Sequence, residues 1–145
     1  MKIRPIMAVV AGCVVWAVVF PVLAYVEARF WPDLAKAARA YFETDTYLVF
    51  STAMLASFQV LWPITNATAG LVTGLIAKRR TEVSVLGVIL VLYFAYNHLW
   101  VLWEDLPIWY NVVVVLLVVP MVLAGGAIAS VMRRRRAAGD TVVAS

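Results

Sequence analysis

The sequence predicts an all-helical membrane protein with four transmembrane helices and a short amphipathic helix between the first two. Two observations support this prediction. First, 65% of the 145 residues are hydrophobic and only 14% are charged, whereas soluble domains average about 45–50% apolar and about 25% charged residues. Second, four long apolar stretches divide the chain. Each can cross a hydrocarbon core of about 30 Å as a helix that rises about 1.5 Å per residue.

The distribution of cationic residues predicts how these helices are oriented. Nine of the twelve Lys and Arg residues precede the first stretch or follow the second and fourth. We expect the protein in a bacterial inner (plasma) membrane. Cytoplasmic loops collect Lys and Arg, so both termini are expected on the cytoplasmic side. The basic excess is expected to touch anionic lipid rather than nucleic acid. The nine residues are Lys2, Arg4, Lys78, Arg79, Arg80, Arg133, Arg134, Arg135 and Arg136.

The first stretch, residues 5–27, has no charge before its last residue and contains Pro21, which is expected to bend it. Two processing signals are alternatives to a retained helix. Ala24 ends a run that resembles a signal-peptide cleavage site, and Cys13 ends a run that resembles a lipobox. Cys13 is the only cysteine, so an intrachain disulfide is impossible.

The connection of residues 29–46 is predicted to form an amphipathic helix that begins near Pro32. Its apolar residues recur at helical spacing, and charged residues occupy the other face. Two placements remain open: a helix lying in the outer membrane interface, or a cap packed on the helix ends. The apolar face consists of Leu34, Ala37, Ala38, Tyr41 and Phe42.

The remaining stretches complete the predicted bundle. The second, residues 47–77, would measure about 46 Å as a helix, so we expect a tilt or a bend at Pro63. The third and fourth, residues 83–103 and 108–132, are joined by a short turn and therefore form an antiparallel hairpin. We predict one transmembrane domain, residues 1–136, and a flexible cytoplasmic tail, residues 137–145.

Small residues recur on the predicted helices at spacings of three or four. Such stripes let helix backbones approach closely, and we expect them to pack the bundle or an oligomer. The glycines concerned are Gly70, Gly74, Gly87, Gly125 and Gly126.

Uncharged polar residues form the candidate site. No Asp, Glu, Lys or Arg falls inside a predicted hydrocarbon span, which argues against a proton-coupled pump. The only histidine lacks the partners that zinc or haem requires, so no metal or cofactor is predicted. We expect either a hydrogen-bonded cluster or a small outward-facing polar pocket, drawn from Gln59, Asn66, Asn97, His98 and Asn111.

The segment from Trp103 to Asn111, with Pro120 and Gly125 downstream, resembles a pattern in small uncharacterised bacterial membrane proteins of similar length. Their hairpin carries a Pro-x-Trp-Tyr stretch followed by an apolar helix with an internal proline. The resemblance covers mainly the last forty or so residues. It implies a four-helix inner-membrane fold and no established activity.

These observations favour a non-enzymatic accessory or scaffold protein whose partners are membrane lipid and a second copy or another membrane protein. The alternative is a small oligomeric transporter or channel that uses the outward-facing polar pocket. A membrane enzyme or redox protein is the third hypothesis. The single cysteine excludes a disulfide-forming membrane oxidoreductase.

Overall fold

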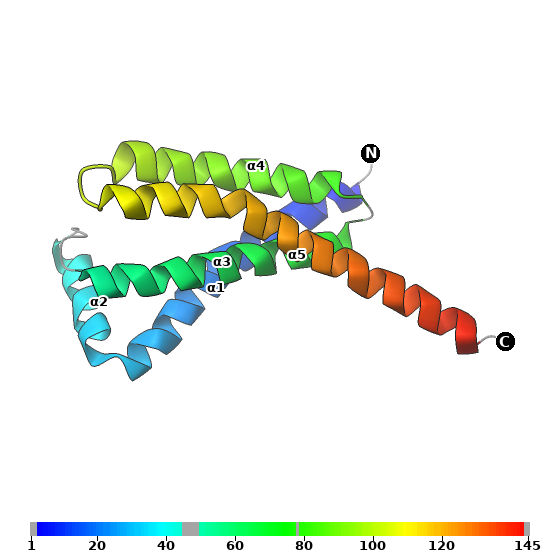
Figure 1. The fold of residues 1–145 in the computed structure, drawn as a ribbon, viewed down its shortest axis with the longest axis horizontal. Coiled ribbons are helices and arrows are strands. Elements are labelled where there is room, and N and C mark those ends of the chain that lie inside the picture. Colours follow the sequence, from blue (N-terminus) through cyan, green and yellow to red (C-terminus); the bar gives the residue numbers. More distant parts are fainter. Residues whose placement is uncertain (1–2, 45–49, 78, 144–145) are drawn as a thin grey trace.

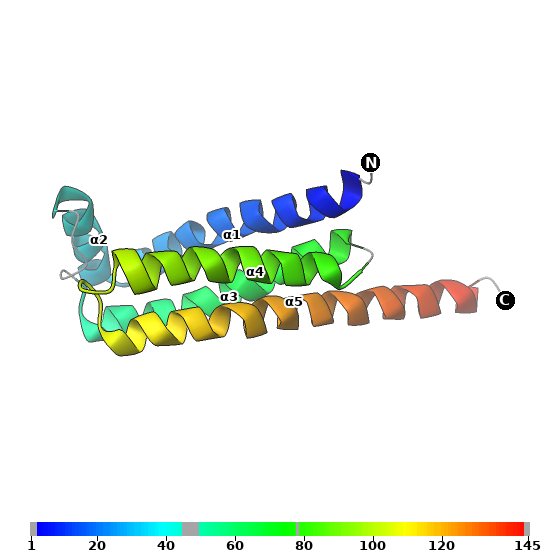
Figure 2. The same cartoon turned by 90° about the horizontal axis from the view of Figure 1, so that it is seen from above.

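The computed structural model describes residues 3–44, 50–77 and 79–143, and this part of the chain is helical without strands. The long helices run side by side, and the short helix α2 lies across one end of them (Figures 1 and 2). The expected start of the second stretch at Tyr47, and Lys78, lie outside the described residues. In order, the elements are α1 (Ile3–Phe30), α2 (Pro32–Thr44), α3 (Thr52–Ile76), α4 (Thr81–Tyr96), the π-helix η2 (Asn97–Val101) and α5 (Ile108–Val143).

Within the described residues, three helical segments are long and apolar enough to cross a membrane: Ile3–Phe30, Thr81–Val101 and Ile108–Arg136. Helix α3 has 25 residues and no charge, yet it is not among them, because its amides and hydroxyls lower its hydropathy. It is nevertheless the central helix, since it packs most extensively on α5 and next on α1. The membrane class and the all-helical fold are therefore confirmed.

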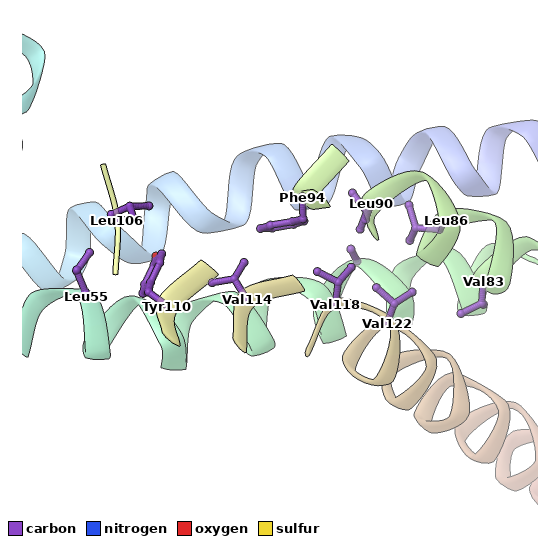
Figure 3. Packing of buried hydrophobic residues seen from close by; sticks show 11 residues of the cluster. Leu55, Val83, Leu86, Leu90, Phe94, Leu106, Tyr110, Val114, Val118 and Val122 are labelled. Atoms are coloured by element: carbon purple, nitrogen blue, oxygen red, sulfur yellow. The ribbon is translucent and has the colours of Figure 1, made fainter. Parts of the chain in front are cut away.

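The hydrophobic core joins α4 and α5 through two rows of side chains with four-residue spacing. Leu86, Leu90 and Phe94 form the row on α4, and each is at most 3% exposed. They face the row on α5, which begins at Val114 and continues one turn at a time to Val122 (Figure 3). Four-residue spacing places side chains on one helix face, so the two rows form a continuous seam.

Close approach of α3 and α5 depends on glycine. A Cβ added at Gly70 would overlap the carbonyl oxygen of Val122, and one added at Gly125 would overlap that of Ala67. Gly74 and Gly126 likewise meet atoms of facing helices. Gly87 differs, because the nearest atom to an added Cβ is 3.8 Å away, which is ordinary contact. The glycines of α3 thus pack within the chain.

Helix α2 packs on the ends of the long helices. Leu34 and Ala37 are buried, and they cluster with Met54 of α3. Partly buried aromatic side chains, including Phe58 of α3, complete this small core. Of the two placements expected for the connection, the packed cap is therefore present, and its start at Pro32 agrees with the prediction.

Two details of the helices differ from the sequence prediction, and a third was not predicted. The third helix does not remain α-helical to residue 103, because residues 97–101 form a π-helix. Helix α5 continues to Val143, through most of the predicted tail, since Arg and Ala favour helix once one has started. It changes direction (Figure 1) beside Val118 and Val122 (Figure 3), where Pro120 removes a backbone hydrogen bond.

Both ends of the described chain lie at one end of the bundle, and α2 and the α4–α5 connection lie at the other (Figure 1). At the first end, two arginines hydrogen-bond the last carbonyls of α3. The Nε atom of Arg4 donates to the oxygen of Ile76 at 2.9 Å. The Nη1 atom of Arg133 donates to the oxygens of Ala77, at 2.7 Å, and of Gly74. Helix C-termini carry unpaired carbonyls and partial negative charge, so these arginines tie α1 and α5 to α3.

We expect Arg133→Ala to lower the free energy of unfolding by about 1.5–3 kcal/mol, because hydrogen bonds from charged groups contribute about that much. Thermal unfolding in mild detergent, followed by circular dichroism, measures the change. Arg135→Ala is the matched control, since Arg135 is exposed and its removal should change stability by less than about 0.5 kcal/mol. Equal losses in the two variants would contradict the capping role.

Candidate functional site

A buried histidine–asparagine pair lies at the end of the bundle that α2 covers. The Nδ1 atom of His98, on η2, is 3.0 Å from the Oδ1 atom of Asn111, in the first turn of α5. His98 is 5% exposed and Asn111 is fully buried. The Nδ2 atom of Asn111 donates to the carbonyl oxygens of Leu106, at 3.3 Å, and Leu102, at 3.5 Å. Because these carbonyls fix the NH₂ end of the amide, the amide oxygen faces His98, and Nδ1 must carry the proton.

The π-helix positions His98. The backbone N–H of Leu102 donates to the carbonyl oxygen of Asn97, five residues earlier, at 2.7 Å. A π-turn is rare and often occurs at functional sites. The imidazole stacks on Phe94 with ring centres 5.7 Å apart, and it lies against Tyr110 at 5.8 Å. The ring is therefore held both by its hydrogen bond and by aromatic neighbours.

Tyr110 connects this pair to α3. The Nε2 atom of Gln59 donates to the backbone oxygen of Tyr110 at 3.1 Å. The indole nitrogen of Trp62 donates to the hydroxyl oxygen of Tyr110, also at 3.1 Å. Both bonds cross from α3 to the first turn of α5. The amides and rings at this end thus form one connected network across three elements.

The structure brings three of the five predicted polar residues together. Gln59, His98 and Asn111 meet around Tyr110. Asn97 does not join them, since it is half-buried and donates to the carbonyl oxygen of Tyr93, one turn earlier, at 2.9 Å. Asn66 lies further along α3 and is fully buried. Neither of its amide atoms has a hydrogen-bond partner among the described residues.

An aromatic cluster beside the network was not predicted. Phe20 stacks on Trp62 with ring centres 3.6 Å apart, and Trp16 stacks on the same indole at 6.2 Å. Phe94 meets Trp62 edge-on at 5.0 Å. A signal for this cluster exists in the sequence: Trp16 and Phe20, like Phe58 and Trp62, are one helical turn apart, so each pair shares a helix face.

The groups gathered at this end are amides, rings and one imidazole, which donate and accept hydrogen bonds. Within the described residues, no three His, Cys, Asp or Glu side chains are grouped so that they could hold a metal ion. With Nδ1 protonated toward Asn111, the Nε2 nitrogen of a neutral His98 ring is its hydrogen-bond acceptor. No protein-family model, curated protein or solved structure matches the chain.

Proposed function

We propose that this protein is a non-enzymatic accessory or scaffold protein of a bacterial inner membrane. The observation that carries the proposal is the hydrogen bonding of the His98–Asn111 pair. Asn111 uses its amide oxygen and nitrogen within the chain, and His98 uses Nδ1. Side chains that could have reacted with a substrate instead fasten η2 and the α4–α5 connection to α5. A rigid helical framework is what an accessory protein presents to its partners.

In the proposed topology, α3 also crosses the membrane, which adds a fourth span to the three described above. The four spans form one transmembrane domain, residues 1–136. The 25 uncharged residues of α3 extend about 37 Å, enough to cross the core. Both termini are cytoplasmic in this topology, because most of the arginines belong to one end of the bundle and cytoplasmic ends collect Lys and Arg. These arginines are Arg4, Arg79, Arg80 and those near the end of α5. The end of the bundle that α2 caps then faces the outer side. The resemblance of residues 103–111 to small four-helix inner-membrane proteins favours the same topology.

The partners in this proposal are membrane lipid and a second copy or another membrane protein. Support comes from the outward face of α1, where Val10, Val14, Val18 and Val22 recur every four residues and are 52–57% exposed. Apolar side chains of this kind contact lipid tails or another helix. Arg134, Arg135 and Arg136 are exposed and suit anionic lipid headgroups.

Native mass spectrometry of the protein purified in mild detergent tests the proposal. We expect the chain to appear in a defined stoichiometry, either with itself or with another membrane protein, together with bound lipid. His98→Gln should leave that stoichiometry unchanged, since the histidine has a structural role. A lipid-bound monomer that conducts solutes after reconstitution into vesicles would contradict the accessory role.

A small oligomeric transporter or channel is the second candidate. The amide of Asn66, which has no partner among the described residues, favours it, because polar groups at membrane depth are costly and often mark a pathway. Solute flux into vesicles, measured with and without Asn66→Leu, separates this candidate from the first. Flux that depends on Asn66 would support transport, whereas the accessory role predicts no flux in either case.

A further inference from the structure

The buried side-chain amide of Asn66, on α3, is not hydrogen-bonded to any described residue. Its side chain is 0% exposed, and neither its oxygen nor its nitrogen has a partner among the described residues. Burying an amide without a partner costs about 1–3 kcal/mol, and buried polar groups nearly always have one. A partner from outside the chain is the simplest way to meet this requirement.

A second unpartnered group lies close to the same place. The indole N–H of Trp16, on α1, is buried and has no acceptor among the described residues. The ring of Trp16 stacks on Trp62 of α3 at 6.2 Å. Asn66 follows Trp62 by four residues and therefore lies one turn away on the same helix face. The indole donor and the amide, both without partners in the described part of the chain, thus flank one tryptophan.

A further unpartnered group lies two turns from Asn66 along α3, on the side of the hydrogen-bonded network. The Oε1 atom of Gln59 is buried without a partner among the described residues, although its Nε2 atom is bonded to Tyr110. Gln59 precedes Trp62 by three residues and shares its face. The hydroxyl of Tyr110 accepts from Trp62 at 3.1 Å and can still donate its own proton. Donors and acceptors are therefore both present around Trp62.

The surroundings limit what such a partner can be. The neighbouring rings of Phe20 and Phe94 are apolar and contact Trp62 directly. The groups that offer hydrogen bonds are amides, an indole and a phenol, which carry no charge, and a buried ion needs compensating charge. The full burial of Asn66 requires a small molecule. The partner is consequently small, uncharged and able both to donate and to accept hydrogen bonds.

We propose that Asn66 and Trp16 form an internal binding site for a small neutral hydrogen-bonding molecule, of which water is the smallest. The molecule bridges α3 and α1, and it supplies the partners that Asn66 and Trp16 lack among the described residues. Water held in a protein interior typically makes about three such bonds. The site is independent of the accessory role, because it rests on interior groups that a partner protein does not reach.

Two measurements on the full-length protein in mild detergent test the site. Infrared difference spectra between H₂¹⁶O and H₂¹⁸O detect an internal water through its shifted O–H stretch, and native mass spectrometry detects a larger neutral solute as a stoichiometric mass increment. We expect one of these signals in the native protein and its loss in Asn66→Leu. The matched control is Thr68→Val on the same helix, whose hydroxyl already donates to Ile64 at 2.7 Å; it should keep the signal.

Absence of both signals from the native protein, or an undiminished signal in Asn66→Leu, would overturn the proposal. If Asn66→Leu does not fold, Trp16→Phe provides a second test, because it keeps an aromatic ring and removes only the N–H donor. We then expect the O–H stretch to move to higher frequency as the bound molecule loses one partner, or the mass increment to disappear. An unchanged signal in Trp16→Phe would equally count against the site.

Discussion

Replacing Gly70 by alanine is expected to lower the free energy of unfolding by about 2–4 kcal/mol, although alanine is the better helix former by about 1 kcal/mol. The added methyl group would overlap the backbone oxygen of Val122. Backbone atoms cannot move aside as a flexible side chain can, so α3 and α5 must separate and lose packing along their contact. Equilibrium unfolding in mixed detergent micelles, followed by tryptophan fluorescence, measures the loss.

Gly87→Ala provides the matched control for this prediction. It makes the same chemical change in a helix, but the nearest atom, Cγ1 of Val122, is 3.8 Å from the new methyl group. We expect no loss of stability and a gain of up to about 1 kcal/mol from helix propensity. If Gly70→Ala were as stable as Gly87→Ala, the prediction that close packing of α3 on α5 requires glycine at position 70 would be wrong.

Replacing Asn111 by leucine is expected to cost about 2–4 kcal/mol. The substitution keeps the approximate volume but removes the acceptor for the Nδ1 proton of His98 and the donor to Leu102 and Leu106. Each buried group left without a partner costs about 1–3 kcal/mol. The same unfolding measurement applies, and the α4–α5 connection should exchange its amide hydrogens faster in the variant.

Two further variants show whether the loss arises from the pair itself. Asn97→Ala removes a half-buried amide that bonds to the preceding turn of its own helix and joins no second helix, so its effect should stay within about 0.5 kcal/mol. In a double-mutant cycle, His98→Phe and Asn111→Leu should be coupled by about 1–2 kcal/mol, because each removes the other's partner. Strictly additive losses would show that the 3.0 Å contact between the two side chains contributes nothing.

Local features were predictable because they depend on neighbouring residues. Apolar runs predicted the long helices, and Pro32 predicted where α2 begins. The polar residues were identified one by one, but their burial and their hydrogen-bond partners differ, and sequence spacing does not predict these differences. Asn97 and His98 are adjacent, but Asn97 is half-buried and bonds within its own helix, whereas His98 is buried against α5. Adjacent side chains on a helix point about 100° apart, and only the packing decides which of the two faces the neighbouring helix.

Long-range pairing required the tertiary structure. Gln59 bonds to Tyr110 across 51 residues of sequence, and Gly70 meets Val122 rather than a second copy of the chain. A stripe of small residues favours close helix contact but does not name the partner helix. For the same reason, the sequence identified Asn66 as polar and deep, and only the packing showed that its amide has no partner among the described residues.

The sequence by itself determined that this is a helical membrane protein, because hydropathy and helix length are properties of each segment alone. It also determined which connections carry the cations. The tertiary structure decided that the polar helix α3 is the centre of the bundle, that its glycines face α5, and that His98 and Asn111 are joined. Those outcomes depend on which helix faces meet, and they follow from shape and hydrogen bonding between segments that are distant in the chain.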